Sequence, residues 1–267
     1  MTSTAPSAPP KEPSPKAFSR LRRAQWSWVW VALSSLAVAG YFTGQYAQGT
    51  LDSLAHQHVG LSDAYASRAL PIRIAFYVHI VTAGLALALG PWQFSKRLRK
   101  RRIRVHRGIG RAYLANVALG AVSALVMSMF NSVGLLGFFG FGSLAVLWGW
   151  TAWRAYRAIR ERDIRSHQAW MIRNFALTYA AVTLRLWFGV LIFIQVPFVH
   201  GPDAAEAILE QAYAPLPFLA WLPNIVIAEF LIRRRGLPAL HLTTTPPAAR
   251  RGEPSPRPPA AAGRPVA

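Results

Sequence analysis

Long apolar blocks alternate with short polar segments along this chain, and the pattern predicts a bundle of membrane helices. Each block carries few charges over about 20 residues, the length that an α-helix needs to cross a bilayer. The apolar residues fill whole blocks and are not confined to one amphipathic face. Six blocks are present, at residues 26–46, 74–94, 111–131, 134–156, 167–196 and 218–232. The sequence therefore predicts an all-α, polytopic membrane protein with six transmembrane helices.

Two segments of low complexity flank the blocks. Residues 1–24 are rich in Pro, Ser, Ala and Thr, and residues 236–267 are rich in Pro, Ala and Arg. Such segments cannot bury an apolar core, so we predict disordered tails. The membrane domain is expected at residues 25–235. Because a long tail precedes the first block, which has the length of a full span, we expect an uncleaved anchor and not a signal peptide.

The charge of the chain is strongly positive, at +20, which by itself would suggest a nucleic-acid partner. The placement of the charge argues against that partner. Basic residues gather in the two tails and in alternate gaps between blocks, most densely at residues 96–111. The exceptions are Arg68, Arg73, Arg173 and Arg185. The positive-inside rule then places both termini in the cytoplasm, and we expect the loop 96–111 to meet anionic lipid headgroups, with no nucleic acid bound.

Four polar residues share one face of the fifth predicted helix. The spacing of His167, Asn174, Thr178 and Arg185 places them on a single helical stripe. An ionisable side chain in lipid is costly unless it is paired or faces a cavity, so the stripe should face the bundle interior. Arg173 lies off this stripe near the cytoplasmic end, and we expect it to snorkel to the headgroups.

An outer polar cluster is predicted from the depths of two residues. Arg185 lies about 27 Å along its helix from His167, which brings it near the depth of His79 on the second predicted helix. Neither side chain is acidic, so the pair suits an anion such as a carboxylate. The structural alternative is that each bonds a backbone carbonyl. Small residues continue the face of His79, which indicates close helix packing or a slot for a flat group.

A second polar cluster is predicted near the cytoplasmic side. His106 opens the third helix, His167 opens the fifth, and Glu229 lies near the inner end of the sixth. Glu229 is the one carboxylate expected inside the membrane, and it can pair with Arg173 or with the two histidines. A solvated loop position remains the alternative for His106. Three amides are expected at one depth further in, at Asn116, Asn174 and Asn224.

The chain resembles a bacterial membrane family in four stretches: YVHIVTAGLALALGPWQF, HRGIGRAY, HQAWMIRNFALTYAAVTLRL and WLPNIVIAE. This family is catalogued as domain of unknown function 2306 (DUF2306), and the resemblance covers residues 74–232. It implies a multi-pass protein of a bacterial inner membrane, and it carries no activity. The residues that it implies to be part of the family's pattern are His79, His106, Arg107, Tyr113, His167, Trp170, Arg173, Arg185, Asn224 and Glu229.

The favoured function is non-enzymatic: a transporter, a sensor or an assembly factor that binds a small ligand between helices. We see no helix interrupted near its middle, as in many secondary transporters. A membrane hydrolase or transferase is disfavoured, because one carboxylate and no cysteine leave little for a nucleophile or metal site. The expected ligand-binding residues are His79, His106, Tyr113, His167, Asn174, Thr178, Arg185, Asn224 and Glu229.

The alternative function is a b-type haem protein that moves electrons across the membrane, loosely similar to ascorbate-dependent b-type cytochromes. Histidines on different helices are what bis-His haem ligation requires. His106 and His167 share one side of the membrane and are the candidate inner ligands. His79 is the candidate on the other side, but it lacks a histidine at matching depth unless His200 folds back from the outer loop.

Overall fold

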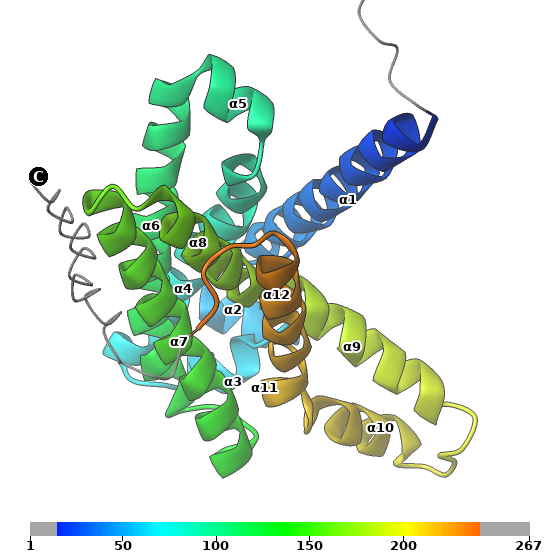
Figure 1. The fold of residues 1–267 in the computed structure, drawn as a ribbon. Coiled ribbons are helices and arrows are strands. Elements are labelled where there is room, and N and C mark those ends of the chain that lie inside the picture. Colours follow the sequence, from blue (N-terminus) through cyan, green and yellow to red (C-terminus); the bar gives the residue numbers. More distant parts are fainter. Residues whose placement is uncertain (1–14, 241–267) are drawn as a thin grey trace, which may run out of the picture.

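The computed structural model describes residues 15–240, and the remaining residues, 1–14 and 241–267, lie outside it (Figure 1). The regular structure in the described part is entirely helical: α1 (Pro15–Gln45), α2 (Leu51–Ala55), α3 (Ser62–Ala66), α4 (Leu70–Gln93), α5 (Lys96–Arg101), α6 (Ile103–Ser128), α7 (Gly134–Arg160), α8 (Ile164–Thr178), α9 (Ala180–Gln195), α10 (Ala204–Tyr213), α11 (Leu216–Leu219) and α12 (Leu222–Arg234).

Five segments of the described chain are long and apolar enough to cross a membrane. They are α4, α6, α7, the α8–α9 segment and the α11–α12 segment. The chain is therefore an all-α, multi-pass membrane protein, as the apolar blocks predict. The first predicted block lies in α1 except for its last residue, and α1 is not one of the five, so the count of six spans remains a prediction.

The core of the bundle is built from α4, α6, α7 and α8, which pack side by side, whereas α9 and α10 project away from it (Figure 1). Close packing depends on small residues at the contacts. A Cβ atom on Gly120 of α6 would lie 2.9 Å from the ring of Trp148 on α7 and 3.0 Å from Thr82 Oγ1 on α4. Tyr113 and Val117 are fully buried on the same face of α6.

A small cap covers one end of the bundle. The helices α2 and α3 enclose the buried side chains of Leu51, Tyr65 and Phe76. An ion pair between Arg73 and Asp52, with 2.6 Å between Nη2 and Oδ2, ties the cap to the start of α4. Burial raises the pKa of Tyr65 to about 12.

The opposite end carries the basic segments, and we call it the basic end. The predicted basic loop 96–111 is helical: it forms α5 and the first turns of α6, so α6 begins at Ile103 and not near residue 111. Arg and Lys are good helix formers, and Ser95 caps α5 by accepting a hydrogen bond from the backbone N–H of Leu98.

The segments next to the predicted tails are partly structured. Helix α1 extends back to Pro15, ten residues into the segment for which a tail is predicted. Gly236, with φ of +60°, ends α12 in a Schellman turn, in which the N–H of Leu237 donates to the carbonyl of Ile232. Leu237 then packs against the buried residues Ala169, Ile172, Ala228 and Ile232.

The last two predicted spans are each interrupted, which corrects the expectation of unbroken helices. Tyr179 separates α8 from α9, and Ala220 and Trp221 separate α11 from α12. Pro223 accounts for the second interruption, because it lacks an N–H and occupies the first turn of α12. At the first interruption the N–H of Val182 donates to the carbonyl of Tyr179, three residues back, which tightens the turn.

Candidate functional site

Five buried polar side chains form one network between α6, α7 and α8. The hydroxyl of Tyr113 lies 2.6 Å from Asn174 Oδ1 and 2.8 Å from Thr178 Oγ1. The indole N–H of Trp148 donates to Thr178 Oγ1 at 2.8 Å. The amide of Asn174 donates to the carbonyl of Trp148 at 2.8 Å and to Thr151 Oγ1 at 2.9 Å. Each of these residues is at most 5% exposed.

Counting protons shows that this network is closed. Tyr113 has one hydroxyl proton, and it donates to Asn174 Oδ1. The one proton of Thr178 is then shared between the hydroxyl of Tyr113, at 2.8 Å, and the carbonyl of Asn174, at 3.0 Å. Thr151 donates to the carbonyl of Trp148 at 3.1 Å. Every side-chain donor then has an acceptor inside the network. Three predicted ligand-binding residues, Tyr113, Asn174 and Thr178, therefore hold helices together with no donor left for a ligand, at about 0.6 kcal/mol per interhelical bond.

Arg173 and Glu229 pair across α8 and α12. Nε of Arg173 lies 2.5 Å from Oε1 of Glu229, and Nη2 lies 3.0 Å from Oε2. Arg173 is 2% exposed, so the expectation that it snorkels to the headgroups is wrong. Of the two partners that the sequence allows Glu229, the structure selects Arg173, because α8 and α12 lie side by side with these residues facing.

Asn224 bridges the two interrupted spans. Its amide donates to the carbonyl of Ala176 on α8 at 3.1 Å and to Thr183 Oγ1 on α9 at 2.9 Å. Thr183 in turn donates to the carbonyl of Ala220, between α11 and α12, at 2.6 Å. The two interruptions thus lie next to each other and are held by two side chains. Asn116, expected at the same depth, bonds only to Ala112 of its own helix.

Arg185 lies beyond the interruption at Tyr179, apart from the rest of its predicted stripe. Its Nη1 donates to the carbonyl of Ala181 at 2.6 Å, and its Cζ lies 3.7 Å from the ring centroid of Phe42 on α1. Its Nε is buried and has no hydrogen-bond partner. None of the ion pairs in residues 15–240 includes Arg185.

Two tyrosines lie within electrostatic range of Arg185. They are Tyr46, after α1, and Tyr213, at the end of α10. Burial raises the pKa of Tyr213, and the charge of Arg185 opposes that rise. His79 is also within range, but its ring bonds elsewhere. In place of the predicted outer pair, Arg185 therefore contacts the ring of Phe42 and has Tyr46, Tyr213 and His79 within electrostatic range.

The histidines on the bundle axis bond backbone carbonyls of neighbouring helices. His79 Nδ1 lies 3.1 Å from the carbonyl of Gly120 on α6, and His167 Nδ1 lies 2.9 Å from that of Ala155 on α7. A carbonyl only accepts, so Nδ1 carries the proton and Nε2 carries the lone pair. This matches the backbone-carbonyl alternative for His79.

His106 and His167 both lie near helix starts at the basic end. His106 lies within electrostatic range of His167 and of Arg99 and Arg107, and its Nδ1 is buried without a partner. His200 is exposed in the loop after α9 and makes no contact with His79 in the described residues. Within those residues no group of three or more His, Asp or Glu side chains is placed to hold a metal ion.

Sequence reasoning missed Trp148, Thr151 and Thr183, which complete the hydrogen bonds of the predicted residues. Trp148 and Thr151 lie on α7, whose sequence reads as a uniformly apolar span, so no polar stripe marked them. Thr183 is five residues from Thr178 and thus off the predicted stripe. Each of the three belongs to a polar cluster only because it bonds a side chain on another helix.

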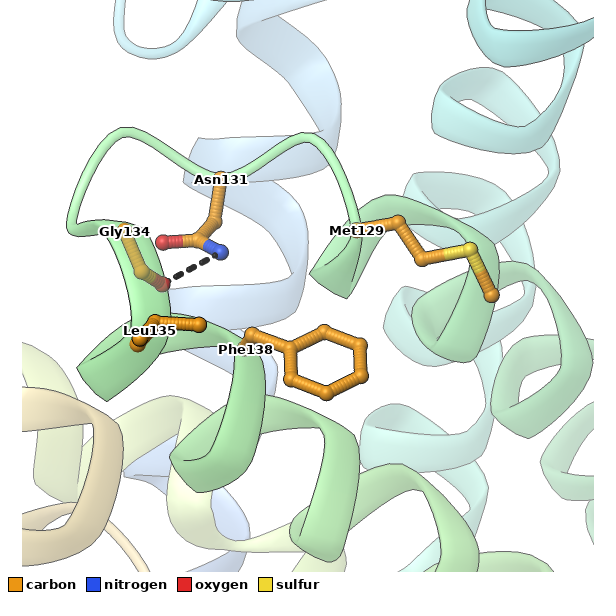
Figure 2. A pocket seen from close by; sticks show the side chains of 5 residues that line it. All are labelled: Met129, Asn131, Gly134, Leu135 and Phe138. Atoms are coloured by element: carbon orange, nitrogen blue, oxygen red, sulfur yellow. Dashed lines mark hydrogen bonds between the residues drawn. The ribbon is translucent and has the colours of Figure 1, made fainter.

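Two shallow pockets lie on the surface of the described residues, and only the second includes a residue of the polar clusters, Glu229. The first, of about 440 Å³, opens at the turn between α6 and α7 and is lined by Met129, Asn131, Gly134, Leu135 and Phe138 (Figure 2). Asn131 points across this turn and donates to the carbonyl of Gly134 at 3.2 Å, so its amide stabilises the turn (Figure 2). The second, of about 350 Å³, follows α12 along Ile225, Val226, Glu229, Phe230 and Arg233. Neither pocket is lined by a histidine or by Arg185.

A comparison with protein families matches residues 76–232 to the family described as predicted membrane protein (DUF2306). No curated protein matches, and no solved structure matches. The match spans more than half of the chain, so the chain belongs to this family of membrane proteins.

Proposed function

We propose that this DUF2306 member is a ligand-binding protein of a bacterial inner membrane, with a transport, sensing or assembly role, and that its ligand is an amphiphilic anion held at Arg185. The basic end faces the cytoplasm in this proposal, since basic loops are retained there. Helix α1 is a sixth span. Trp28 of α1 donates to the carbonyl of Pro91 on α4 at 3.0 Å, and Ser34 bonds Tyr179 at 2.8 Å, so α1 packs against two of the five spans.

The observation that carries the proposal is the unpaired charge of Arg185. The residue lies about 15 Å along α9 from Gln195, well inside an apolar span. An intramembrane arginine normally has an acidic partner or reaches water. Arg185 has one backbone carbonyl and a buried Nε with no partner. A carboxylate or phosphate would supply the missing acceptor and the missing charge.

The surroundings of Arg185 favour a ligand with an apolar body. The ring of Phe42 lies against its guanidinium, Tyr46 and Tyr213 are within electrostatic range, and all three side chains are partly buried. Neither of the two pockets is lined by Arg185. Helices α1 and α9 both extend away from the bundle on the same side (Figure 1). A ligand that dissolves in the bilayer reaches Arg185 from that side, where its chain lies against aromatic rings.

The paired interruptions support a role in which α9 moves. Helix α9 carries Arg185 and follows the break at Tyr179, and α10 and α11 return to the second break. In many transporters, interrupted helices form the substrate site, and residues at the ends of helices can serve as hinges. Binding an anion at Arg185 would therefore bias the position of α9 relative to α8.

The test is thermal unfolding of the purified protein in an uncharged detergent, with dodecanoate as the probe and dodecanol as its uncharged counterpart. We expect dodecanoate, and not dodecanol, to raise the Tm of the wild type. Arg185→Gln should fold and lose this rise, and Arg185→Lys should keep part of it. Arg68→Gln is the matched control, since Arg68 also bonds one backbone carbonyl and lies over one ring, Phe130.

A rise that survives in Arg185→Gln, or that dodecanol reproduces, would reject the anion site. If Arg185→Gln does not fold, Arg185→Lys decides: a complete loss of the dodecanoate effect in a folded lysine variant also rejects the proposal, because the charge is retained there.

A specific observation favours a second candidate, the b-type haem protein. His79 and His167 each donate Nδ1–H to a backbone carbonyl and keep an Nε2 lone pair, the arrangement that orients metal-ligating histidines. His106 and His167 would be the pair that holds a haem at the basic end, where the group would supply one-electron transfer. His79 has no second histidine, so the residues fit one haem at most.

The absorption spectrum separates the two candidates. We would record the detergent-purified protein oxidised and dithionite-reduced, from cells supplied with haem precursor. A Soret band that shifts on reduction and disappears in His167→Ala would establish the haem site. A featureless spectrum would eliminate it.

A further inference from the structure

Three arginines at the basic end of α7 each lie over the aromatic ring four residues before them. The distances from Cζ to the ring centroid are 5.6 Å for Arg154 on Trp150, 5.2 Å for Arg157 on Trp153 and 5.9 Å for Arg160 on Tyr156. Residues four apart are neighbours on a helix, so the sequence WTAWRAYRAIR builds this series by itself. Stacking occupies the flat face of a guanidinium and leaves its N–H groups free at the edge.

Two of the three arginines use those N–H groups within the protein. Arg157 donates to Glu161 at 2.7 Å, and Arg160 donates to the hydroxyl of Tyr156 at 3.0 Å. Arg154 makes no hydrogen bond and no ion pair with any residue in the described part of the chain. Its five donors are therefore available to a ligand.

A second ring fixes the position of Arg154. Its Cζ lies 4.7 Å from the ring centroid of Trp170 on α8, and Trp150 and Trp170 contact each other edge to face at 5.0 Å. Trp170 is 6% exposed, so this part of the site is rigid. Arg173 also lies over Trp170, at 4.6 Å, but Glu229 neutralises it. Of the two arginines that lie over Trp170, Arg154 is therefore the one whose charge is not paired.

The surroundings of Arg154 match the interface of a bilayer. It lies about 9 Å along α7 from Arg160, at the basic end of the span. Trp150 and Trp153 are 39% and 49% exposed, so both rings reach the surface of the bundle. Tryptophan is enriched at the level of the headgroups, where its ring meets both acyl chains and polar groups.

We infer that Arg154, held between Trp150 and Trp170, binds the phosphate of an anionic phospholipid. The guanidinium edge matches two phosphate oxygens, the net charge of the lipid compensates that of Arg154, and the exposed tryptophan faces contact the acyl chains. The exposed rings favour a lipid over free phosphate, which would gain nothing from them. This site does not depend on the proposed role of Arg185.

The test is native mass spectrometry of the full chain released from detergent micelles containing either phosphatidylglycerol or phosphatidylcholine. We expect the wild type to retain phosphatidylglycerol preferentially. Arg154→Gln should lower that retention about fivefold, the effect of one basic residue at a membrane surface. Arg154→Lys should lose part of the preference for phosphatidylglycerol, because lysine keeps the charge but lacks the planar guanidinium that binds two phosphate oxygens. Arg160→Gln is the matched control and should bind as the wild type does, because Arg160 lies over a single ring and donates one of its N–H groups to Tyr156.

Several outcomes would overturn the site. One is equal lipid retention in Arg154→Gln and the wild type. Another is equal loss in Arg160→Gln, which would indicate general attraction to the basic end. Wild-type retention in Arg154→Lys would show that charge alone suffices without the stacked geometry. Displacement of the lipid by millimolar inorganic phosphate would mean that the site takes free phosphate.

Discussion

Arg173 and Glu229 form a two-point ion pair that joins α8 to α12 where both helices lie inside the apolar bundle. The distances between their atoms, 2.5 and 3.0 Å, define a fork-to-fork geometry. Arg173 also donates to the carbonyl of Pro238, at 3.5 Å, so the same guanidinium reaches the segment that follows α12. One residue thus orders the packing of the last span and of the chain beyond it.

Removing one member of this pair should destabilise the protein more than removing both. Arg173→Met leaves the carboxylate of Glu229 without its partner, and breaking such a pair costs about 3–5 kcal/mol. Because the side chain of Glu229 is 24% exposed, we expect the lower end of that range. The double variant Arg173→Met/Glu229→Leu should recover part of the loss. Thermal unfolding of the single and double variants in detergent measures the coupling, and purely additive losses would contradict it.

The hydroxyl of Tyr113 should be a strong determinant of stability. Tyr113→Phe removes the donor to Asn174 Oδ1 within a fully buried network, and Thr178 keeps the carbonyl of Asn174 as its acceptor. A buried acceptor left without its donor costs about 1–3 kcal/mol. Tyr156→Phe is the control, since that hydroxyl meets only the exposed Arg160. A Tm for Tyr113→Phe equal to that of the control would show that the network is not closed as described.

Asp163 should make the start of α8 sensitive to acid. Its Oδ1 accepts a hydrogen bond from the N–H of Ser166 at 2.9 Å, and the bonds to Ser166 hold the pKa of Asp163 below its usual value of 3.8. A lowered folded-state pKa gives stability that is present above the unfolded-state pKa and is lost as pH falls through the folded value.

Two variants separate the charge of Asp163 from its capping role. Asp163→Asn keeps an acceptor at the N-cap and does not titrate, so its Tm should fall less than that of the wild type below about pH 4. Asp163→Ala should have the lower Tm already at neutral pH. Parallel pH profiles for the wild type and Asp163→Asn would count against the cap as the source of the acid sensitivity.

The sequence predicted the features that are determined within a single helix, such as its length and the residues that share one of its faces. Apolar length located the spans, and spacing placed His167, Asn174 and Thr178 on one buried face. Counting depth along each helix also placed His106 and His167 on one side of the membrane, and it allowed Glu229 to pair either with Arg173 or with these histidines. What these residues bond could not be predicted, since Trp148 and Thr151 meet them only through the packing of α7.

The prediction for Arg185 shows that residues with helical spacing do not always lie together in the structure. The spacing assumes an unbroken helix from His167, and the turn at Tyr179 changes the direction in which later residues point. That turn has no proline or glycine to mark it. It is held by Asn224 and Thr183, so its cause is a contact between two spans and not a local sequence signal.

The paired interruptions should open together when Asn224 is lost. Asn224→Leu removes the donor to Ala176 and Thr183 while keeping the side-chain volume, and Thr183 alone then holds Ala220. Local opening is controlled by such few contacts, so we expect amide hydrogen exchange around residues 176–183 and 216–224 to rise roughly tenfold. Asn116→Leu, which breaks only a bond within α6, should leave both regions unchanged. Faster exchange in only one of the two regions would mean that the two interruptions open independently. The segment from α9 to α11 could not then move as one unit between them.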